Sequence, residues 1–224
     1  MVRMLFSAIM FSLLQVWEDA SDRSPSGQMA LDEALLGLSS QPVLRLYRWA
    51  APAVTFGYAQ RHAEVRVLAG SLPAVRRWTG GGTVFHGLDL TLTLAVPAPH
   101  PLCSERPERI YRRIHEALLM ALREEYPAAR LAGVEDGRPG PACFQSPALH
   151  DILCSGKKIC GGALRRGKSG VLYQGSLHGA VPAASLARSL AESAEPFAPD
   201  PALERAGARL DREKYATEKW NLMR

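Results

Sequence analysis

The chain has 224 residues, of which 47% are hydrophobic and 22% charged, so it can bury a full core and is neither disordered nor fibrous. Its net charge of +5 is modest and its basic residues are dispersed, which argues against a nucleic-acid-binding arm and favours an acidic protein or small-molecule partner. The four cysteines show no C-x-x-C pair and no metal-binding spacing with the six histidines, which argues against a metal site or disulfide framework and favours a cytoplasmic protein.

The N-terminal segment contains an apolar run at residues 4–14 behind Arg3, similar to the core of a signal peptide. No small-residue cleavage site follows it and it is too short to span a bilayer, so we interpret it as the approach to a first strand. We expect residues 1–15 to hold an N-terminal extension and the start of that strand, with Met10 as a second candidate start. Residues 16–224 are expected to form a single domain, since no repeat or long linker interrupts them.

The first half of this domain shows short apolar segments around one helix. After a loop rich in Ser, Asp, Pro and Gly, apolar residues at helical spacing predict a helix at 28–36, with Asp32 and Glu33 on its polar side. The patterns that follow predict two strands, a short helix and a strand, in this order: 43–49, 53–57, 65–70 and 74–78.

The second half contains the strongest helical pattern of the chain. Apolar residues repeat at i, i+4 and i+7 from Ile110 to Leu122, with Ser104 as a candidate cap. Other patterns predict a strand at 91–96, a hairpin at 152–166 that turns at Ser155-Gly156, a strand at 171–177 and helical pieces after Val181. Together these elements predict an α+β fold.

Three consecutive glycines at residues 80–82 need a specific explanation. Glycines lose more backbone entropy on folding than other residues, so we interpret them as a turn where a ligand approaches main-chain N–H groups. Arg76 or Arg77 could bind a carboxylate or phosphate there. The loop lacks the ending of a P-loop and the spaced glycines of a dinucleotide fingerprint, and we interpret Gly167-Lys168-Ser169 as a hairpin turn.

Three segments together resemble the lipoate–protein ligase and octanoyltransferase superfamily, which also contains the biotin–protein ligases. Residues 76–86 resemble its R-R-x-[ST]-G-G-G-x-V-[FY]-H signature, residues 29–34 its first-helix motif, and residues 151–163 its D-[IV]-x-x-x-G-[KR]-K-[IV]-x-G-x-A motif. The resemblance implies a mixed β-sheet flanked by helices, in the architecture of the biotin/lipoate protein ligase catalytic domain. It also implies the attachment of octanoyl or lipoyl groups to a lysine of a lipoyl domain.

The same motifs imply which residues form the site. Lys158 matches the essential lysine of the family, and its ammonium could hydrogen-bond the acyl oxygen as negative charge develops. We interpret the neighbouring Lys157 as a solvated charge, because alternate residues of a strand face opposite ways. The implied substrate-binding residues are Tyr58, Gln60, Arg76, Arg77, Gly80, Gly81, Gly82, Thr83, Val84, His86, Gly161 and Ala163; no metal ligand is implied.

How the acyl group is activated depends on a second resemblance. Residues 142–151 resemble the A-C-F-x-x-P-x-x-x-[DE] segment of the LipM-type octanoyltransferases, in which the cysteine is the nucleophile, so Cys143 is the candidate for a thioester. A free cysteine that only packs as a small hydrophobe is the alternative. Tyr58 also favours transfer, whereas Gly82 and a segment at 215–221 are more similar to the ligases. Gln174 stands where much of the family has histidine.

These resemblances imply a set of partners and cofactors. A transferase would take octanoyl from acyl carrier protein without a cofactor, whereas the alternative, a lipoate–protein ligase, would use ATP and magnesium. The protein partner would be a lipoyl domain of a 2-oxoacid dehydrogenase or the glycine cleavage H protein, with no nucleic acid or membrane. A biotin ligase is disfavoured because its G-R-G-R-x-x-R-x-W loop is absent, and Lys158 argues against a non-catalytic binding module.

Overall fold

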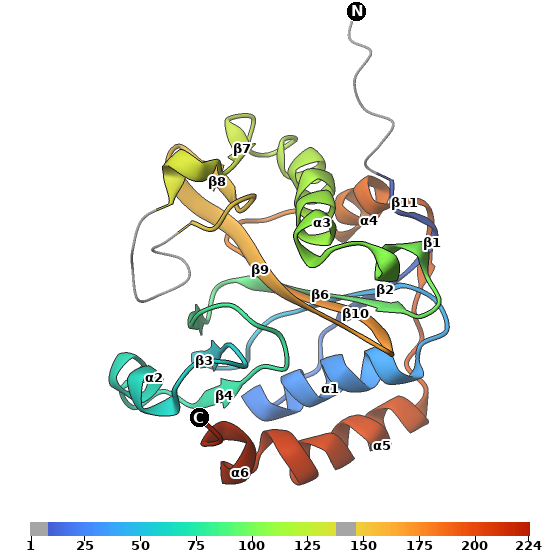
Figure 1. The fold of residues 1–224 in the computed structure, drawn as a ribbon. Coiled ribbons are helices and arrows are strands. Elements are labelled where there is room, and N and C mark those ends of the chain that lie inside the picture. Colours follow the sequence, from blue (N-terminus) through green and yellow to red (C-terminus); the bar gives the residue numbers. More distant parts are fainter. Residues whose placement is uncertain (1–8, 138–146) are drawn as a thin grey trace, which may run out of the picture.

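A computed structural model describes residues 9–137 and 147–224 of the chain (Figure 1). Its strands and helices, in order, are β1 (Phe11–Asp19), α1 (Pro25–Leu38), β2 (Val43–Tyr47), β3 (Ala53–Phe56), α2 (His62–Ala69), β4 (Ala74–Arg76), β5 (Val84–His86), β6 (Leu90–Pro97), α3 (Pro107–Leu122), β7 (Ala129–Leu131), β8 (Ile152–Cys154), β9 (Lys157–Gly167), β10 (Gly170–Leu177), α4 (Ala183–Leu190), β11 (Ala191–Pro196), α5 (Pro201–Leu210) and α6 (Glu218–Asn221).

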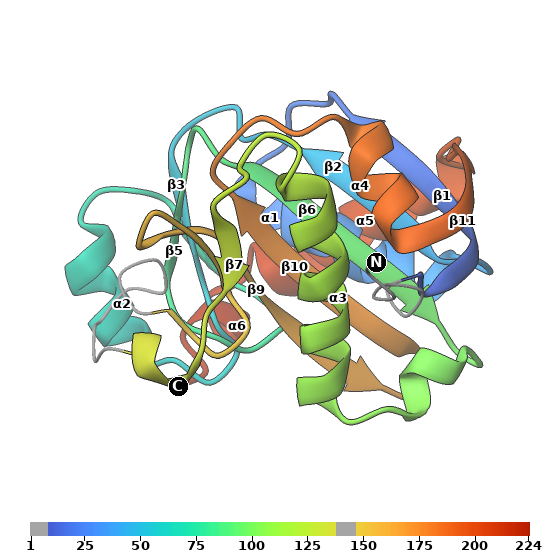
Figure 2. The same cartoon turned by 90° about the horizontal axis from the view of Figure 1, so that it is seen from above.

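The strands form two sheets. The larger has the order β11-β1-β2-β6-β10-β9-β8-β7, and the smaller has the order β4-β3-β5. Strand β1 runs parallel to both β2 and β11, whereas the pairs from β2 through β7 are antiparallel, so the larger sheet is mixed. Helices α3 and α4 cover one face and α1 and α5 the other (Figures 1 and 2). The predicted mixed sheet flanked by helices is confirmed.

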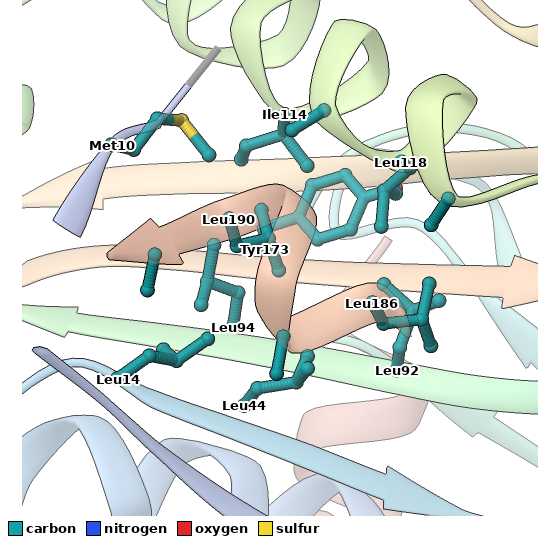
Figure 3. Close-up of a cluster of buried hydrophobic side chains, with 14 of the residues drawn as sticks. Met10, Leu14, Leu44, Leu92, Leu94, Ile114, Leu118, Tyr173, Leu186 and Leu190 are labelled. Atoms are coloured by element: carbon teal, nitrogen blue, oxygen red, sulfur yellow. The ribbon is translucent and has the colours of Figure 1, made fainter. Parts of the chain in front are cut away.

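The main core lies between the larger sheet and the helices α3 and α4 (Figure 3). Ile110, Ile114 and Leu118 are buried at helical spacing on α3 and face residues such as Leu92 and Leu94 of β6. Burial of each such side chain contributes about 1.5–3 kcal/mol, before the entropy cost of ordering it. This contact explains why the strongest helical pattern of the sequence predicts α3 well.

The start of α3 differs from the prediction. Ser104 belongs to a separate 3-10 turn (Pro101–Ser104), and α3 begins at Pro107 after Arg106, whose side chain makes no capping bond. Proline is favoured in the first turn because its ring presets φ and it has no N–H to satisfy. The capping role predicted for Ser104 is therefore wrong.

Helix α1 is more buried than its sequence pattern predicts. It begins at Pro25 rather than near residue 28, and the Ser24 hydroxyl caps it by accepting from Gly27 N at 3.0 Å. Asp32 is fully buried, so its placement on a polar side is wrong. The reason is that α1 lies between the sheet, where Arg45 of β2 pairs with Asp32 at 2.6 Å, and α5 on its outer side.

The predicted hairpin is present, whereas one further strand was missed. The hairpin is confirmed, with β8 and β9 joined by Ser155 and Gly156, both at positive φ as a tight two-residue turn requires. Strand β11 was not predicted, because its residues after Ala191 are exposed and show no alternating apolar pattern, and pairing with β1 holds it as an edge strand. None of the helices in residues 9–137 and 147–224 has the length and apolar character needed to cross a membrane.

Candidate functional site

A pocket lies between Arg77, at the start of the glycine loop (residues 77–83), strand β5 and strands β9 and β10. Among its lining residues are six that the resemblance predicted for the site: Arg77, Val84, His86, Lys158, Gly161 and Ala163. Eight others complete it: Met29, Trp49, Thr55, Thr91, Gly162, Gln174, Gly175 and Ser176. The other motif residues, Tyr58, Gln60, Arg76, Gly80, Gly81, Gly82 and Thr83, do not line it, and Cys143 lies outside the described residues.

The glycine loop connects β4 to β5 and packs closely against Gly57, at the end of β3. A Cβ on Gly57 would lie 1.9 Å from the carbonyl oxygen of Gly81, a distance that no side chain can occupy. Gly81 itself has a φ of +80°, which disfavours other residues. Tyr58 N donates to Thr79 O at 2.9 Å and Arg77 N donates to Phe56 O at 2.8 Å, so the two segments are joined on both sides of this contact. Glycine is therefore required here for backbone packing.

Arg77 holds the glycine loop from within. Its Nη2 donates to the carbonyl oxygens of Gly80 and Gly82, each at 2.9 Å, and its Nη1 donates to Thr55 Oγ1 at 2.8 Å. Gln60 provides a second support, since its amide nitrogen donates to Thr83 Oγ1 at 3.0 Å. These contacts present Val84 and His86 to the cavity.

Arg76, by contrast, joins the loop to the C-terminal segment. Its guanidinium donates to the main-chain carbonyls of Tyr58, Gln60, Trp220 and Asn221, at 2.7–3.1 Å. Its backbone N–H donates to Asn221 Oδ1 at 2.8 Å, and its carbonyl accepts from Trp220 Nε1 at 2.9 Å. Arg76 is fully buried. The described hydrogen bonds of its guanidinium thus go to main-chain carbonyls, and together with the backbone bonds of Arg76 they link α6 to the glycine loop.

Lys158 lies at the β8–β9 end of the cavity in a buried ion pair. Its Nζ is 2.7 Å from Asp151 Oδ2, and the two side chains are only 4% and 1% exposed. Ala148 N donates to the same oxygen at 2.6 Å, and the Tyr111 hydroxyl donates to Oδ1 at 2.5 Å. A buried charge is stable only when it is paired and hydrogen-bonded, as Asp151 is. The carboxylate therefore holds the lysine ammonium at the cavity wall.

His86 forms a second polar group in the cavity, through partners that the motif did not identify. Burial lowers the pKa of His86, so its ring is neutral at neutral pH. Its Nδ1 is 2.9 Å from the Asp89 carboxylate, which can only accept, so Nδ1 carries the hydrogen. Nε2 then accepts from Thr55 Oγ1 at 2.8 Å, and the same oxygen accepts from Arg77. This chain of hydrogen bonds determines the tautomer.

Asp89 is the ionised end of that chain. Burial alone would raise its pKa, but hydrogen bonds from His86, from Ser176 Oγ at 2.7 Å and from Gly87 N at 3.0 Å outweigh burial and lower the pKa to about 2. The Thr91 hydroxyl donates to it as well, at 3.2 Å. Polar residues spaced two apart on otherwise apolar strands are the sequence signal that could have identified Thr91 and Ser176.

A third polar network connects α1 to the cavity. Gln174 of β10 accepts from Thr79 Oγ1 and donates to Asp32 Oδ2, both at 2.7 Å, and Asp32 pairs with Arg45. All four side chains are buried. Gln174 therefore connects the residue before the glycines to the ion pair beneath α1. The amide oxygen of Gln174 accepts from Thr79, and its amide nitrogen donates to Asp32.

The described cysteines lie apart from this chemistry. Cys160 is fully buried in the main core, where burial and then the charge of Asp151 raise its pKa to about 12. Its thiol is protonated at neutral pH, so Cys160 acts as a packing residue of the core. Cys103 and Cys154 are half-buried free thiols that do not line the cavity.

Comparison with known proteins points to one family. The model of the lipoyl protein ligase A/B catalytic domain matches residues 24–203. The octanoyltransferase LipM of Macrococcus caseolyticus is 35% identical over 170 residues, which cover 69% of this chain and 62% of that protein. The octanoyltransferase LipM of Moorella thermoacetica is 34% identical over 176 residues, covering 73% and 63%. The matched region thus spans less than two thirds of either relative.

Solved structures share the fold. A lipoate-protein ligase A bound with ATP superposes with a TM-score of 0.72 at 21% identity, over 93% of this chain and 98% of that one. A bi-partite lipoate protein ligase from Thermoplasma acidophilum, described with its E2 lipoyl domain, has a TM-score of 0.65 at 21% identity, with 96% of each chain covered. At this identity the similarity concerns the architecture.

Proposed function

This chain belongs to the family of lipoyl protein ligase A/B catalytic domains, and on that premise we propose that it is an octanoyltransferase of protein lipoylation. The proposed reaction moves octanoyl from acyl carrier protein to the target lysine of a lipoyl domain. The observation that carries the proposal is the buried Lys158–Asp151 pair at the cavity wall, within the motif that resembles the family. The names of the relatives, octanoyltransferases 34–35% identical to this chain, favour the transferase over the ligase.

The first proposed step forms a thioester on Cys143. The thiolate attacks the carbonyl carbon of the octanoyl thioester, the bond to the carrier sulfur breaks, and the carrier leaves as a thiolate. Support comes from the sequence resemblance around Cys143 and from Ala148, five residues later, whose N–H binds the carboxylate that pairs with Lys158. The N–H of Ala148 and the ammonium of Lys158 therefore bind the same carboxylate.

In the second proposed step, the lysine amine of the lipoyl domain attacks the Cys143 thioester. A carbon–nitrogen bond forms, the carbon–sulfur bond breaks, and Cys143 returns as a thiolate. The proton that the amine loses balances the one that the carrier thiolate takes up. In both steps negative charge develops on the acyl oxygen, and the ammonium of Lys158, held by Asp151, is the donor proposed to stabilise it.

The cavity offers an apolar wall for the acyl chain. Met29, Trp49, Val84 and Ala163 line it, whereas its polar groups are concentrated around His86 and Lys158. Apolar walls with a few placed polar groups are typical of small-molecule sites. The proposed transferase requires no cofactor, because the thioester of the donor already supplies the activated acyl group.

An ATP-dependent lipoate–protein ligase is the second candidate. The specific observation in its favour is the segment at 215–221, which resembles a closing segment of ligases and whose Trp220 and Asn221 are bonded to Arg76. ATP with magnesium would then supply the activation. Lys158 and Arg77 are the cationic side chains among the described cavity residues. They would therefore be the candidates to bind the phosphate of an acyl-adenylate.

The proposed protein partner is a lipoyl domain, of a 2-oxoacid dehydrogenase or of the glycine cleavage H protein, together with acyl carrier protein. One ligase of similar fold is described with its E2 lipoyl domain. The net charge of +5 suits an acidic domain, because complementary charges accelerate encounter.

Intact-mass analysis of a lipoyl domain tests the proposal directly. The protein is incubated with the domain and either octanoyl–acyl carrier protein, or octanoate with ATP and magnesium. We expect octanoylation in the first mixture and none in the second. Octanoylation in the second mixture alone would establish the ligase, and the absence of octanoylation in both would overturn both candidates.

A further inference from the structure

Tyr111 and His115 of α3 lie directly behind the Lys158–Asp151 pair, although no motif includes them. They are four residues apart, so they share one face of the helix, and α3 packs against β9 (Figure 2). Their rings are stacked, with centroids 4.1 Å apart and planes at 26°. The helix thus places two polar aromatic side chains at the hairpin that carries Lys158.

The hydrogen bonds of Tyr111 have only one consistent direction. Gly162 N donates to the Tyr111 oxygen at 3.0 Å, because a backbone N–H cannot accept. The hydroxyl hydrogen is therefore given to Asp151 Oδ1, at 2.5 Å. Burial, and then the charge of Asp151, raise the pKa of Tyr111 well above its usual value, so this hydrogen is retained. Tyr111 connects the carboxylate to the main chain of β9.

Asp151 divides its two oxygens between these partners. Oδ2 faces Lys158 Nζ at 2.7 Å and Ala148 N at 2.6 Å, whereas Oδ1 faces the tyrosine. The carboxylate of an aspartate can rotate about its Cβ–Cγ bond unless both oxygens are bound. The tyrosine hydroxyl therefore sets the plane of the carboxylate and, through it, the position of the ammonium.

His115 supports the ring of Tyr111. It is fully buried, burial lowers its pKa to about 3, and its Nε2 is 2.8 Å from the hydroxyl of Tyr173. A neutral imidazole fixed in this way provides a flat surface for the tyrosine ring without adding a charge beside Lys158.

We propose that Tyr111 is a positioning residue of the acyl-transfer site, which holds Lys158 at the cavity through Asp151, with His115 as the support of its ring. The proposal rests on the proposed function, in which Lys158 stabilises the developing charge. Helix α3 thereby supports the site through Tyr111, which acts on Lys158 through Asp151 and is not assigned a contact with the substrate.

Lysine labelling of the full-length protein tests the position of Lys158 without relying on activity. Tyr111→Phe removes the hydroxyl and keeps the ring; Tyr126→Phe is the matched control, because that hydroxyl accepts from Ala180 N at 3.3 Å and does not line the cavity. With limiting acetylating reagent and peptide mass spectrometry, Tyr111→Phe should raise the labelling rate of Lys158 about tenfold relative to Lys168, as expected for a lost bond to a charged group. An unchanged rate would overturn the proposal.

Steady-state transfer provides the functional readout. Tyr111→Phe should lower kcat about tenfold and leave KM for the octanoyl donor within about twofold. A merely structural effect would instead lower the thermal stability and would raise KM as well as lower kcat. If the wild-type protein transfers no octanoyl, the proposed function is wrong. The labelling experiment still tests whether Tyr111 positions Lys158, because it does not depend on activity. If Tyr111→Phe does not fold, His115→Gln replaces it and should raise Lys158 labelling in the same direction; an unchanged rate there also overturns the proposal.

Discussion

Gly161 lies where any side chain would displace Lys158. A Cβ at this position would be 2.2 Å from Lys158 Cε and 2.5 Å from Nζ, so the main chain of β9 passes directly beside the ammonium. The glycine in the third motif is thus explained by the space that the lysine needs.

We therefore expect Gly161→Ala to fold and to lose most of its transfer activity. The added methyl would push away the flexible end of the lysine, and a misplacement of about 1 Å can reduce a rate by about a hundredfold. Gly167→Ala, at the far end of the same strand, is the control, because a Cβ there meets nothing within 4 Å. Equal octanoylation rates for the two variants would contradict this explanation.

Lys158→Ala should reduce octanoylation by about a hundredfold or more, the usual effect of removing one donor to a developing oxyanion. The adjacent Lys157→Ala is the matched control, since Lys157 is exposed and does not line the cavity. Rates are measured from the intact mass of the lipoyl domain. Undiminished transfer by Lys158→Ala would exclude Lys158 from the chemistry.

Cys143→Ala should abolish the acyl-enzyme, because it removes the sulfur that forms the proposed thioester. Incubation of the protein with octanoyl–acyl carrier protein and no lipoyl domain should add one octanoyl group to the wild type, in a form that hydroxylamine removes. Cys154→Ala, a half-buried thiol outside the cavity, should retain the adduct. Full transfer activity in Cys143→Ala would show that this thiol only packs.

Asp89→Asn should change how the free energy of unfolding depends on pH. The folded pKa of Asp89 is about 2, below its unfolded value of 3.8, so its stabilisation is present above about pH 4 and is lost as pH falls toward 2. This shift corresponds to about 2 kcal/mol. In urea unfolding, the stability gap between wild type and Asp89→Asn should therefore narrow across that range.

Asn221→Ala should loosen the glycine loop. The substitution leaves the backbone N–H of Arg76 without the Oδ1 acceptor that it has at 2.8 Å, at a cost of about 1–3 kcal/mol if no other acceptor replaces it. Hydrogen exchange at the Arg76 amide should accelerate, whereas substitution of the neighbouring residue Leu222, which is 48% exposed, by Ala should leave it unchanged. Unaltered exchange in Asn221→Ala would show that the C-terminal segment does not stabilise the loop.

Much of the fold was predictable where short-range pattern and packing agree. The face of α3 from Ile110 to Leu118 and the turn at Ser155-Gly156 have local physical causes, namely helical spacing of apolar residues and a tight turn, so their elements were predicted correctly. Strand β11 was missed because pairing with β1 sustains it without a period-2 apolar pattern. The buried state of Asp32 was missed because it depends on Arg45, on a different element.

The sequence by itself determined the family, through motifs whose residues are close together along the chain, and it named Lys158 and the glycine loop as parts of one site. Only the tertiary structure decided that Arg77 faces the cavity while Arg76 binds the C-terminal segment, and that Asp89, Gln174 and Tyr111 support the site. The physical reason is that hydrogen bonds and ion pairs between distant residues depend on which strand faces meet, and sequence spacing alone does not contain that information.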